Sequence, residues 1–234
     1  TWTFELSIPE DAALSRLYYL REARQGGMYR WPDGPGLSRW LGLPRDGPIF
    51  SARLRFIPYL DDTAIGTRTA IVAPMRYVGT DQVKGEFEKP VLIVPAVSVA
   101  VTPGGVVWPQ GQLDARTITV SLRSEADEGG SGEVRLQAPE GWTVSPTSRP
   151  FELASAGAQR SVSFEIRARP SVTAGEHVFQ AVARVGGQAY DEGFTLIDYE
   201  HIERSAMFAD AEARVTVVPV AVRDGLKVGY IMGT

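Results

Sequence analysis

Residues 133–146 read Glu-Val-Arg-Leu-Gln-Ala-Pro-Glu-Gly-Trp-Thr-Val-Ser-Pro. Apolar and polar residues alternate on both sides of the Pro-Glu-Gly turn, so each flank has one apolar face and one polar face. This alternation predicts two β-strands, and strands joined by such short turns are typical of a small β-sandwich. The large aromatic residue of the stretch is Trp142, which we expect in the core of that sandwich.

The same rhythm continues through the C-terminal part of the chain. Turn signals separate short alternating stretches at intervals of about 8–12 residues, which is typical of an immunoglobulin-like sandwich. We expect Trp108 at the base of this sandwich and the acidic, glycine-rich segment 124–131 at a hairpin tip. The predicted strands are 116–122, 132–138, 142–145, 160–168, 177–185 and 211–218.

The N-terminal part also contains alternating stretches, at residues 2–8, 50–57 and 69–77. Between them, residues 29–48 are dense in glycine and proline, which predicts a long structured loop. Residues 11–24 could form a short helix, but Tyr18-Tyr19-Leu20 favours a strand and Gln25-Gly26-Gly27 ends any regular element, so we expect irregular structure there. The three stretches indicate a first sandwich module.

An apolar run over residues 91–101 has Pro95 at its centre, and a proline cannot donate a hydrogen bond to a central ladder. This pattern predicts one strand that ends module one, a hinge, and one strand that opens module two. With 234 residues, the chain is long enough for two modules of about 100 residues each. The expected fold is therefore all-β, with immunoglobulin-like β-sandwiches over 1–94 and 95–219, and with a short strand of a truncated α/β domain within 220–234.

Composition excludes several classes of function. The chain has no cysteine, which removes disulfides, thiolate nucleophiles and zinc-thiolate sites. Its net charge of −4, without a basic face, does not favour a nucleic-acid partner. No apolar run approaches the ~20 residues of a membrane span. Because the sequence begins with Thr1, we expect it to be a mature or excised piece of a longer protein.

The sequence contains no recognisable catalytic or metal-binding constellation. Glu176 lies on the opposite strand face from His177, so the two side chains cannot bind one ion. His201 has three acidic neighbours, and a hydrogen-bonded packing role is favoured there over metal binding or catalysis. The segment 129–132 lacks the strand-to-helix turn of a nucleophilic serine. We expect no catalytic residue, no metal and no cofactor in this chain.

Tyr29, Trp31 and Trp40 lie on the loop rich in glycine and proline. Their rings could form a flat platform on which sugar rings stack. The favoured alternative is that they plug the open end of module one, because large aromatic residues near the end of a sandwich are usually buried.

A family resemblance adds to these interpretations. Residues 132–146, followed by 151–153, 162–166 and the Pro170 to Gly175 spacing, resemble the β-sandwich domain associated with bacterial α-galactosidases. A wider order resembles the region after the catalytic domain in long bacterial LmbE-like, PIG-L-type deacetylases, and this resemblance covers most of the chain. It comprises Tyr-Arg-Trp at 29–31, Met-Arg-Tyr at 75–77, the run 90–99, Tyr-Glu-His-Ile at 199–202 and residues 227–233.

The resemblance implies a position within a larger enzyme. Members of that family use zinc to remove acetyl from N-acetylglucosamine-type substrates, and their metal motif Ala-His-Pro-Asp-Asp-Glu does not occur in this sequence. No catalytic or metal residue is therefore carried over. One departure is Glu200, which stands where the family has proline in Tyr-Pro-His-Ile.

The implied role is that of a non-catalytic accessory or spacer region of an extracytoplasmic protein. It would orient or dock the neighbouring domains of the polypeptide, namely the deacetylase and a domain similar to class I glutamine amidotransferases whose first strand is 226–232. The alternative is binding of a glycan or cell-envelope polysaccharide through Tyr29, Trp31 and Trp40.

Overall fold

The computed structural model describes residues 5, 8–9, 12–22, 26–31, 41–66, 69–220 and 225–230. Among these residues the regular elements are β-strands and one short 3-10 helix, so the all-β fold class is confirmed. The chain divides into two compact units. The first contains Thr1–Val94 and Phe194–Phe208, and the second contains Pro95–Gly193 and Ala209–Thr234.

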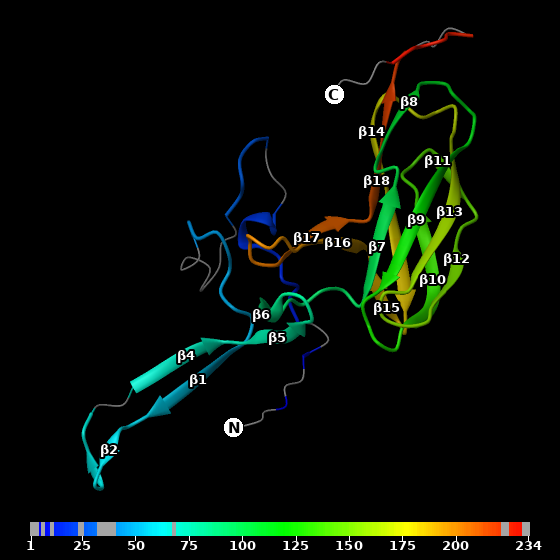
Figure 1. Cartoon of the computed structure of the whole chain (residues 1–234). Coiled ribbons are helices and arrows are strands. Elements are labelled where there is room, and N and C mark those ends of the chain that lie inside the picture. The colour runs from blue at the N-terminus through cyan, green and yellow to red at the C-terminus, as the bar shows by residue number, and fades with distance from the viewer. Residues whose placement is uncertain are drawn as a thin grey trace. The chain divides into compact units, whose positions relative to one another are not determined.

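The second unit is an immunoglobulin-like sandwich of two sheets (Figure 1). The strands of one sheet are β8 (Gly105–Pro109), β10 (Gly130–Gln137), β12 (Arg149–Leu153), β14 (Gly175–Val185), β15 (Gln188–Tyr190) and β18 (Glu212–Val218). They are arranged in the order β12-β10-β14-β18-β8, and β15 pairs with β14. The strands of the other sheet are β7 (Val97–Thr102), β9 (Arg116–Ser124), β11 (Trp142–Ser145) and β13 (Gln159–Ala168), in the order β11-β13-β9-β7.

The six strands predicted between residues 116 and 218 are all present, and their ends differ from the prediction by at most two residues. Of the two strands predicted within residues 91–101, the one that opens this unit is β7, whereas the prediction of one that ends module one is wrong, because residues 91–95 form no strand. Two further strands, β8 and β12, lie at the edges of their sheet. Each contains a proline, Pro109 or Pro150, which is compatible with an edge position but weakens the sequence signal of a strand.

The connection between β10 and β11 is not a hairpin, because the two strands belong to different sheets. The same is true of the link between β9 and β10. Segment 124–131 therefore crosses from one sheet to the other, and its prediction as a hairpin tip was wrong. Alternation reports which face of a strand is buried, and a strand buries the same face whether its chain neighbour lies beside it or opposite it.

Trp142 joins the two sheets at the core. Its side chain is buried, and its ring makes edge-to-face contacts with Trp108 at 4.9 Å and Phe179 at 5.2 Å between ring centroids. Trp142 comes from β11, whereas its two partners come from β8 and β14 of the opposite sheet. The predicted core positions of Trp142 and Trp108 are confirmed, and aromatic pairs of this geometry add about 0.5–1.5 kcal/mol to the burial of their area.

Replacement of Trp142 by alanine is expected to lower the free energy of unfolding of the sandwich by about 3–5 kcal/mol, because it leaves a cavity between the sheets. Urea unfolding followed by far-UV circular dichroism measures this change. The matched control is Thr143→Ala, since Thr143 is the next residue of β11 and is exposed. A loss of less than about 1 kcal/mol on Trp142→Ala would contradict the central position of this ring.

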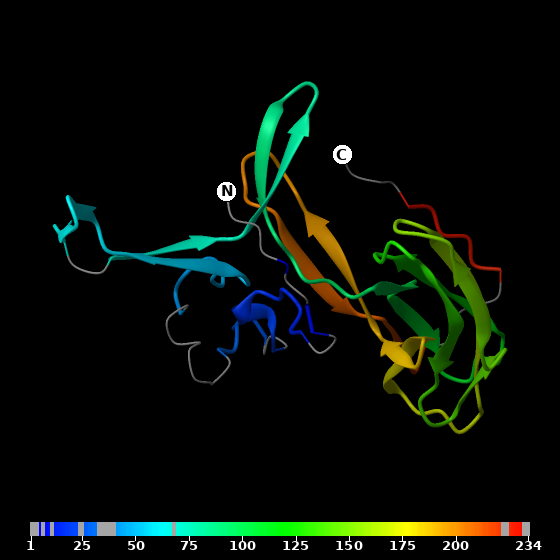
Figure 2. The same ribbon diagram turned by 90° about the horizontal axis from the view of Figure 1, so that it is seen from below.

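The described strands of the first unit pair two by two (Figures 1 and 2). The pairs are β1 (Ser51–Phe56) with β4 (Thr69–Pro74), β2 (Tyr59–Leu60) with β3 (Thr63–Ala64), β5 (Arg76–Asp81) with β6 (Gly85–Pro90), and β16 (Glu192–Ile197) with β17 (Ser205–Asp210). The 3-10 helix η1 (Tyr18–Leu20) precedes them. The described residues thus form four ribbons where the sequence predicts a first sandwich.

Burial explains this difference. Among the described residues, the buried hydrophobic side chains of the first unit are Tyr18 and Ala206, and all the others belong to the second unit. A two-stranded ribbon has no second layer with which to cover its apolar face. Segment 194–208 joins this unit although the sequence places it in module two, because it lies in the ribbon that β16 and β17 form.

Some predictions concern residues at the ends of the chain. Within the predicted strand 2–8, residues 5 and 8 are described and lie in no strand, and the others are outside the described residues. At the C-terminus, residues 226–230 are described without strand structure, and Ile231 and Met232 of the predicted strand 226–232 are outside the described residues.

Candidate binding sites of the first unit

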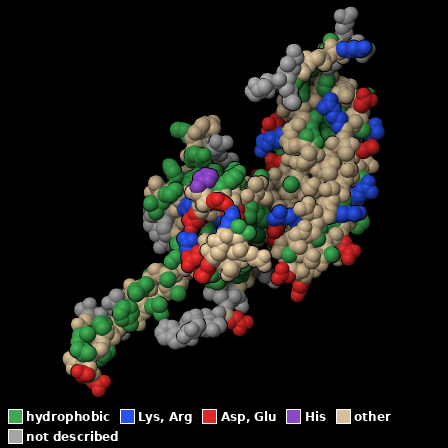
Figure 3. All heavy atoms as spheres, in the orientation of Figure 1, with side chains coloured by type: hydrophobic (Ala, Val, Ile, Leu, Met, Phe, Trp, Pro, Cys, Tyr) green, Lys and Arg blue, Asp and Glu red, His purple; other side chains and the backbone are tan. Residues whose placement is uncertain are grey.

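The β1–β4 ribbon is amphipathic. Residues that pair directly across an antiparallel ribbon share a face, so Leu54 and Ile71 lie on one face together with Phe56. These three side chains are 41%, 50% and 47% exposed. Arg53 and Arg55 lie on the opposite face. Figure 3 shows hydrophobic side chains along the ribbon, and those of its apolar face are about half exposed to solvent.

Two of the three predicted aromatic residues, Tyr29 and Trp31, belong to a cluster at η1. The ring of Trp31 stacks on Tyr18 with 5.4 Å between centroids and 23° between planes. Tyr29 makes an edge contact with Tyr19 at 5.4 Å, and Tyr18 and Tyr19 are in edge contact at 5.3 Å. Trp31 and Tyr29 remain 51% and 43% exposed. Trp40, the third predicted member, lies outside the described residues.

Hydrogen bonds fix the base of this cluster. The Tyr18 hydroxyl donates to the Leu43 carbonyl at 2.9 Å and accepts from the Gly42 N–H at 3.0 Å. The Tyr18 N–H donates to Asp46 Oδ1 at 2.9 Å, and Arg21 pairs with the same carboxylate. Burial raises the pKa of Tyr19 above its ordinary value, with smaller contributions from the neighbouring Tyr29 and Tyr18. The sequence prediction missed Tyr18, whose only signal is the aromatic pair Tyr18-Tyr19.

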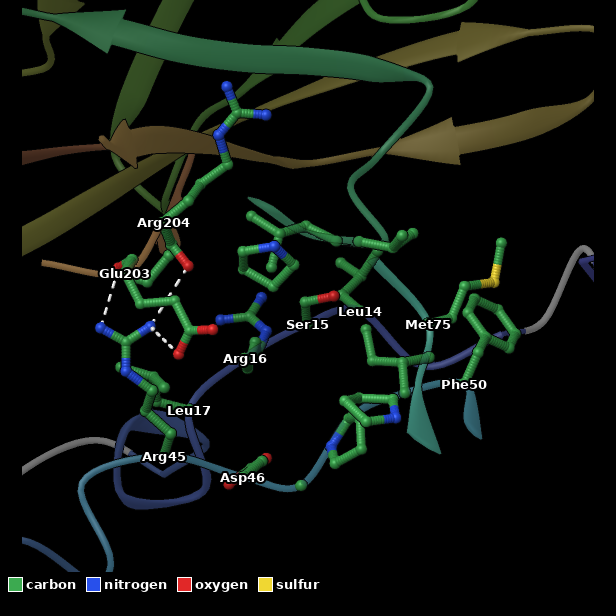
Figure 4. Close-up of a pocket in the computed structure, with 18 of the residues that line it drawn as sticks. Leu14, Ser15, Arg16, Leu17, Arg45, Asp46, Phe50, Met75, Glu203 and Arg204 are labelled. Carbon is green, nitrogen blue, oxygen red and sulfur yellow. Dashed lines mark hydrogen bonds and ion pairs between the residues drawn. The ribbon is translucent and has the colours of Figure 1, made fainter. Parts of the chain in front are cut away.

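A pocket of about 680 Å³ lies elsewhere in the first unit (Figure 4). Two hydrogen bonds hold one of its walls, because Ser15 N–H donates to the Ile93 carbonyl at 3.0 Å and Ile93 N–H donates to Ser15 Oγ at 2.6 Å. The pocket is lined by residues of five segments, 13–21, 45–50, 72–76, 90–92 and 203–205.

Glu203 organises the charged end of this pocket. Its carboxylate pairs with Arg45 at 3.3 Å and with Arg76 at 2.8 Å. Arg45 also donates to the backbone carbonyls of Glu203 at 2.8 Å and Arg204 at 3.3 Å. In Figure 4, Phe50 and Met75 lie across the pocket from Arg45 and Glu203. Sequence reasoning missed this site because its residues are far apart in the chain and form no local motif.

A second ion-pair cluster centres on Asp198. Its carboxylate accepts from Arg204 at 2.7 Å and from Lys89 at 2.6 Å. The hydrogen bond from Arg204, and then that from Lys89, lowers the pKa of Asp198 below its ordinary value of 3.8. Because the folded pKa is the lower one, the stabilisation is present above pH ~3.8 and is lost as the pH falls through the folded pKa.

The substitution Arg204→Gln is expected to raise the pKa of Asp198 towards 3.8, because it removes the principal hydrogen-bond donor. Titration of the carboxyl carbon by NMR measures the change. Arg135→Gln removes an ion pair with Glu133 on the sandwich and serves as the control that leaves Asp198 unchanged. An Asp198 pKa that is the same with and without Arg204 would contradict the assigned cause.

The two histidines have packing contacts. His177 lies 5.5 Å from the Trp142 ring, and its Nε2 is 3.0 Å from the Thr173 carbonyl. The ring of His201 lies 6.0 Å from that of Tyr199. Within the described ranges, no group of three or more His, Asp or Glu side chains is arranged to hold a metal ion. In the same part of the chain, no helix is long and apolar enough to cross a membrane.

Comparisons with known proteins gave fold similarities of low score. No family model matches the chain, and no curated protein matches it. Among solved structures, the chain is similar to WR4, a C. elegans MSP family member, with 11% identity over 51% of this chain and 97% of that chain, and a TM-score of 0.29. It is also similar to the E. coli chaperone DraB, with 16% identity over 54% of this chain and 57% of that chain, and a TM-score of 0.30.

Proposed function

We propose that this chain is a non-catalytic accessory region that docks onto a neighbouring domain of a longer polypeptide. The observation that carries the proposal is the exposed apolar face of the β1–β4 ribbon, which contains Leu54, Phe56 and Ile71. An isolated two-stranded ribbon is marginally stable in water, and exposed apolar patches mark surfaces that bind other proteins. A partner on this face would cover side chains that the ribbon cannot cover itself.

The family resemblance suggests which domain is the partner. In long LmbE-like deacetylases, the region that this chain resembles follows the zinc-dependent catalytic domain. Docking of the ribbon would therefore orient that domain relative to the sandwich. The opposite face of the ribbon carries the charged side chains of Arg53 and Arg55 beside Val72, so it is the more polar of the two faces. Zinc-dependent release of acetate from N-acetylated amino sugars by the isolated chain would contradict the non-catalytic part of the proposal.

The double variant Leu54→Ser and Ile71→Ser is expected to weaken binding to the preceding domain at least about 100-fold, because each buried large aliphatic side chain contributes about 1.5–3 kcal/mol. Isothermal titration calorimetry of the separately produced domain with this chain measures the affinity. The matched control is Arg53→Ser with Val72→Ser, a directly paired couple on the opposite face. Equal losses in the two double variants, or none in the first, would contradict docking through the apolar face.

A second candidate function is glycan binding by the aromatic cluster. It is favoured by the half-exposed ring of Trp31, which is supported from below by the buried and hydrogen-bonded Tyr18. A rigid, exposed indole is the type of surface on which a sugar ring can stack. Tyr29 lies within the same cluster and adds a second exposed ring.

Titration with oligosaccharides of N-acetylglucosamine is expected to change the tryptophan fluorescence saturably, and Trp31→Ala should weaken binding about fivefold or more. Tyr59→Ala removes a ring of the β2–β3 ribbon that is 61% exposed, and it should leave the affinity unchanged. A protein whose fluorescence does not respond to the sugars would contradict this second function.

A further inference from the structure

The pocket of the first unit carries an excess of positive charge. Arg204 lines the pocket but is paired with Asp198, and in Figure 4 its guanidinium points away from Arg45 and Glu203. The other charged groups of the lining are four guanidinium groups and two carboxylates, which belong to Arg16, Arg21, Arg45, Arg76, Asp46 and Glu203. This surplus attracts an anion, and it does so more strongly in a partly enclosed pocket than at an open surface.

The arginines at the charged end are held in place before any ligand arrives. The Arg45 guanidinium is fixed by two backbone carbonyls as well as by Glu203. Glu203 also holds Arg76, and Arg16 packs its guanidinium over the Phe208 ring at 4.9 Å. Guanidinium groups present planar pairs of donors that match the two oxygens of a carboxylate.

The other end of the pocket is apolar. Its walls include Leu14, Ile49, Phe50, Val72 and Met75. A pocket of about 680 Å³ with mostly apolar walls and a few oriented charged groups has the size and composition of a site for a small organic molecule. The apolar part of such a molecule would lie against Phe50 and Met75, opposite Arg45 (Figure 4).

We infer that this pocket binds an amphipathic carboxylate, a small organic anion whose carboxylate contacts Arg45 and Arg76 and whose apolar body lies against Phe50 and Met75. Arg45 and Arg76 then donate to two carboxylates at once, that of Glu203 and that of the ligand. This site is separate from the apolar face of the ribbon and does not depend on the docking function proposed above.

Three probes with the same apolar body and different head groups test the inference in the unmodified chain. They are 4-phenylbutyrate, 4-phenylbutanol and 4-phenylbutylamine, and calorimetric titration measures their affinities. The carboxylate is expected to bind saturably, the alcohol at least about tenfold more weakly, and the amine more weakly still. Equal affinities for the three probes, or no saturable binding of the carboxylate, would overturn the inference.

Two variants should change the affinity for 4-phenylbutyrate in opposite directions. Arg76→Gln removes a donor and should weaken binding about three- to tenfold, whereas Glu203→Gln removes the competing carboxylate and should strengthen binding by a similar factor. Arg135→Gln, which breaks an ion pair on the sandwich, is the control and should have no effect. If Arg76→Gln leaves the affinity for 4-phenylbutyrate unchanged, the carboxylate does not contact Arg76 and the inference is overturned.

Discussion

The contact of Trp142 with Trp108 and Phe179 joins the two sheets of the sandwich, and burial between these sheets accounts for the folded state of the second unit. Each sheet covers the apolar face of the other, so each alternating strand has one face buried in the core and one face in contact with water. The described strands of the first unit also alternate apolar and polar residues, but they pair only as two-stranded ribbons. Between the described parts of the two units, the difference is that the sandwich has a second layer and the ribbons do not.

The first unit is held together largely by polar contacts. Asp46 connects to Tyr18 and Arg21, and Glu203 connects to Arg45 and Arg76. Such partly exposed pairs contribute little individually, about 0–1 kcal/mol each. Among the described residues of this unit, the apolar side chains of the β1–β4 ribbon are about half exposed, and a pocket lies between distant segments. Both features accompany the small number of buried hydrophobic side chains in the described part of the unit.

Much of the sandwich could be predicted because period-two alternation is a local signal. Strands such as β9, β11 and β13 carry that signal over their whole length, whereas β8 and β12 lose it at prolines that edge positions tolerate. Alternation also predicted β1 and β4, but it does not report whether a second sheet exists to cover them. Tyr29 and Trp31 could be singled out from their loop, but the sequence favoured their burial, whereas their side chains are 43% and 51% exposed. Tyr18 beneath them, and the Glu203 pocket, depend on contacts between distant segments, which no local pattern encodes.

Hydrogen exchange of the β1 and β4 amides tests most directly the claim that this ribbon needs a partner. In the isolated chain, these amides should exchange rapidly, while amides of β9, β13 and β14 in the sandwich are strongly protected. When the proposed partner domain is bound, protection of the ribbon should rise about 100-fold and that of the sandwich should stay the same. Slow exchange of the ribbon in the isolated chain, equal to that of the sandwich, would contradict the account.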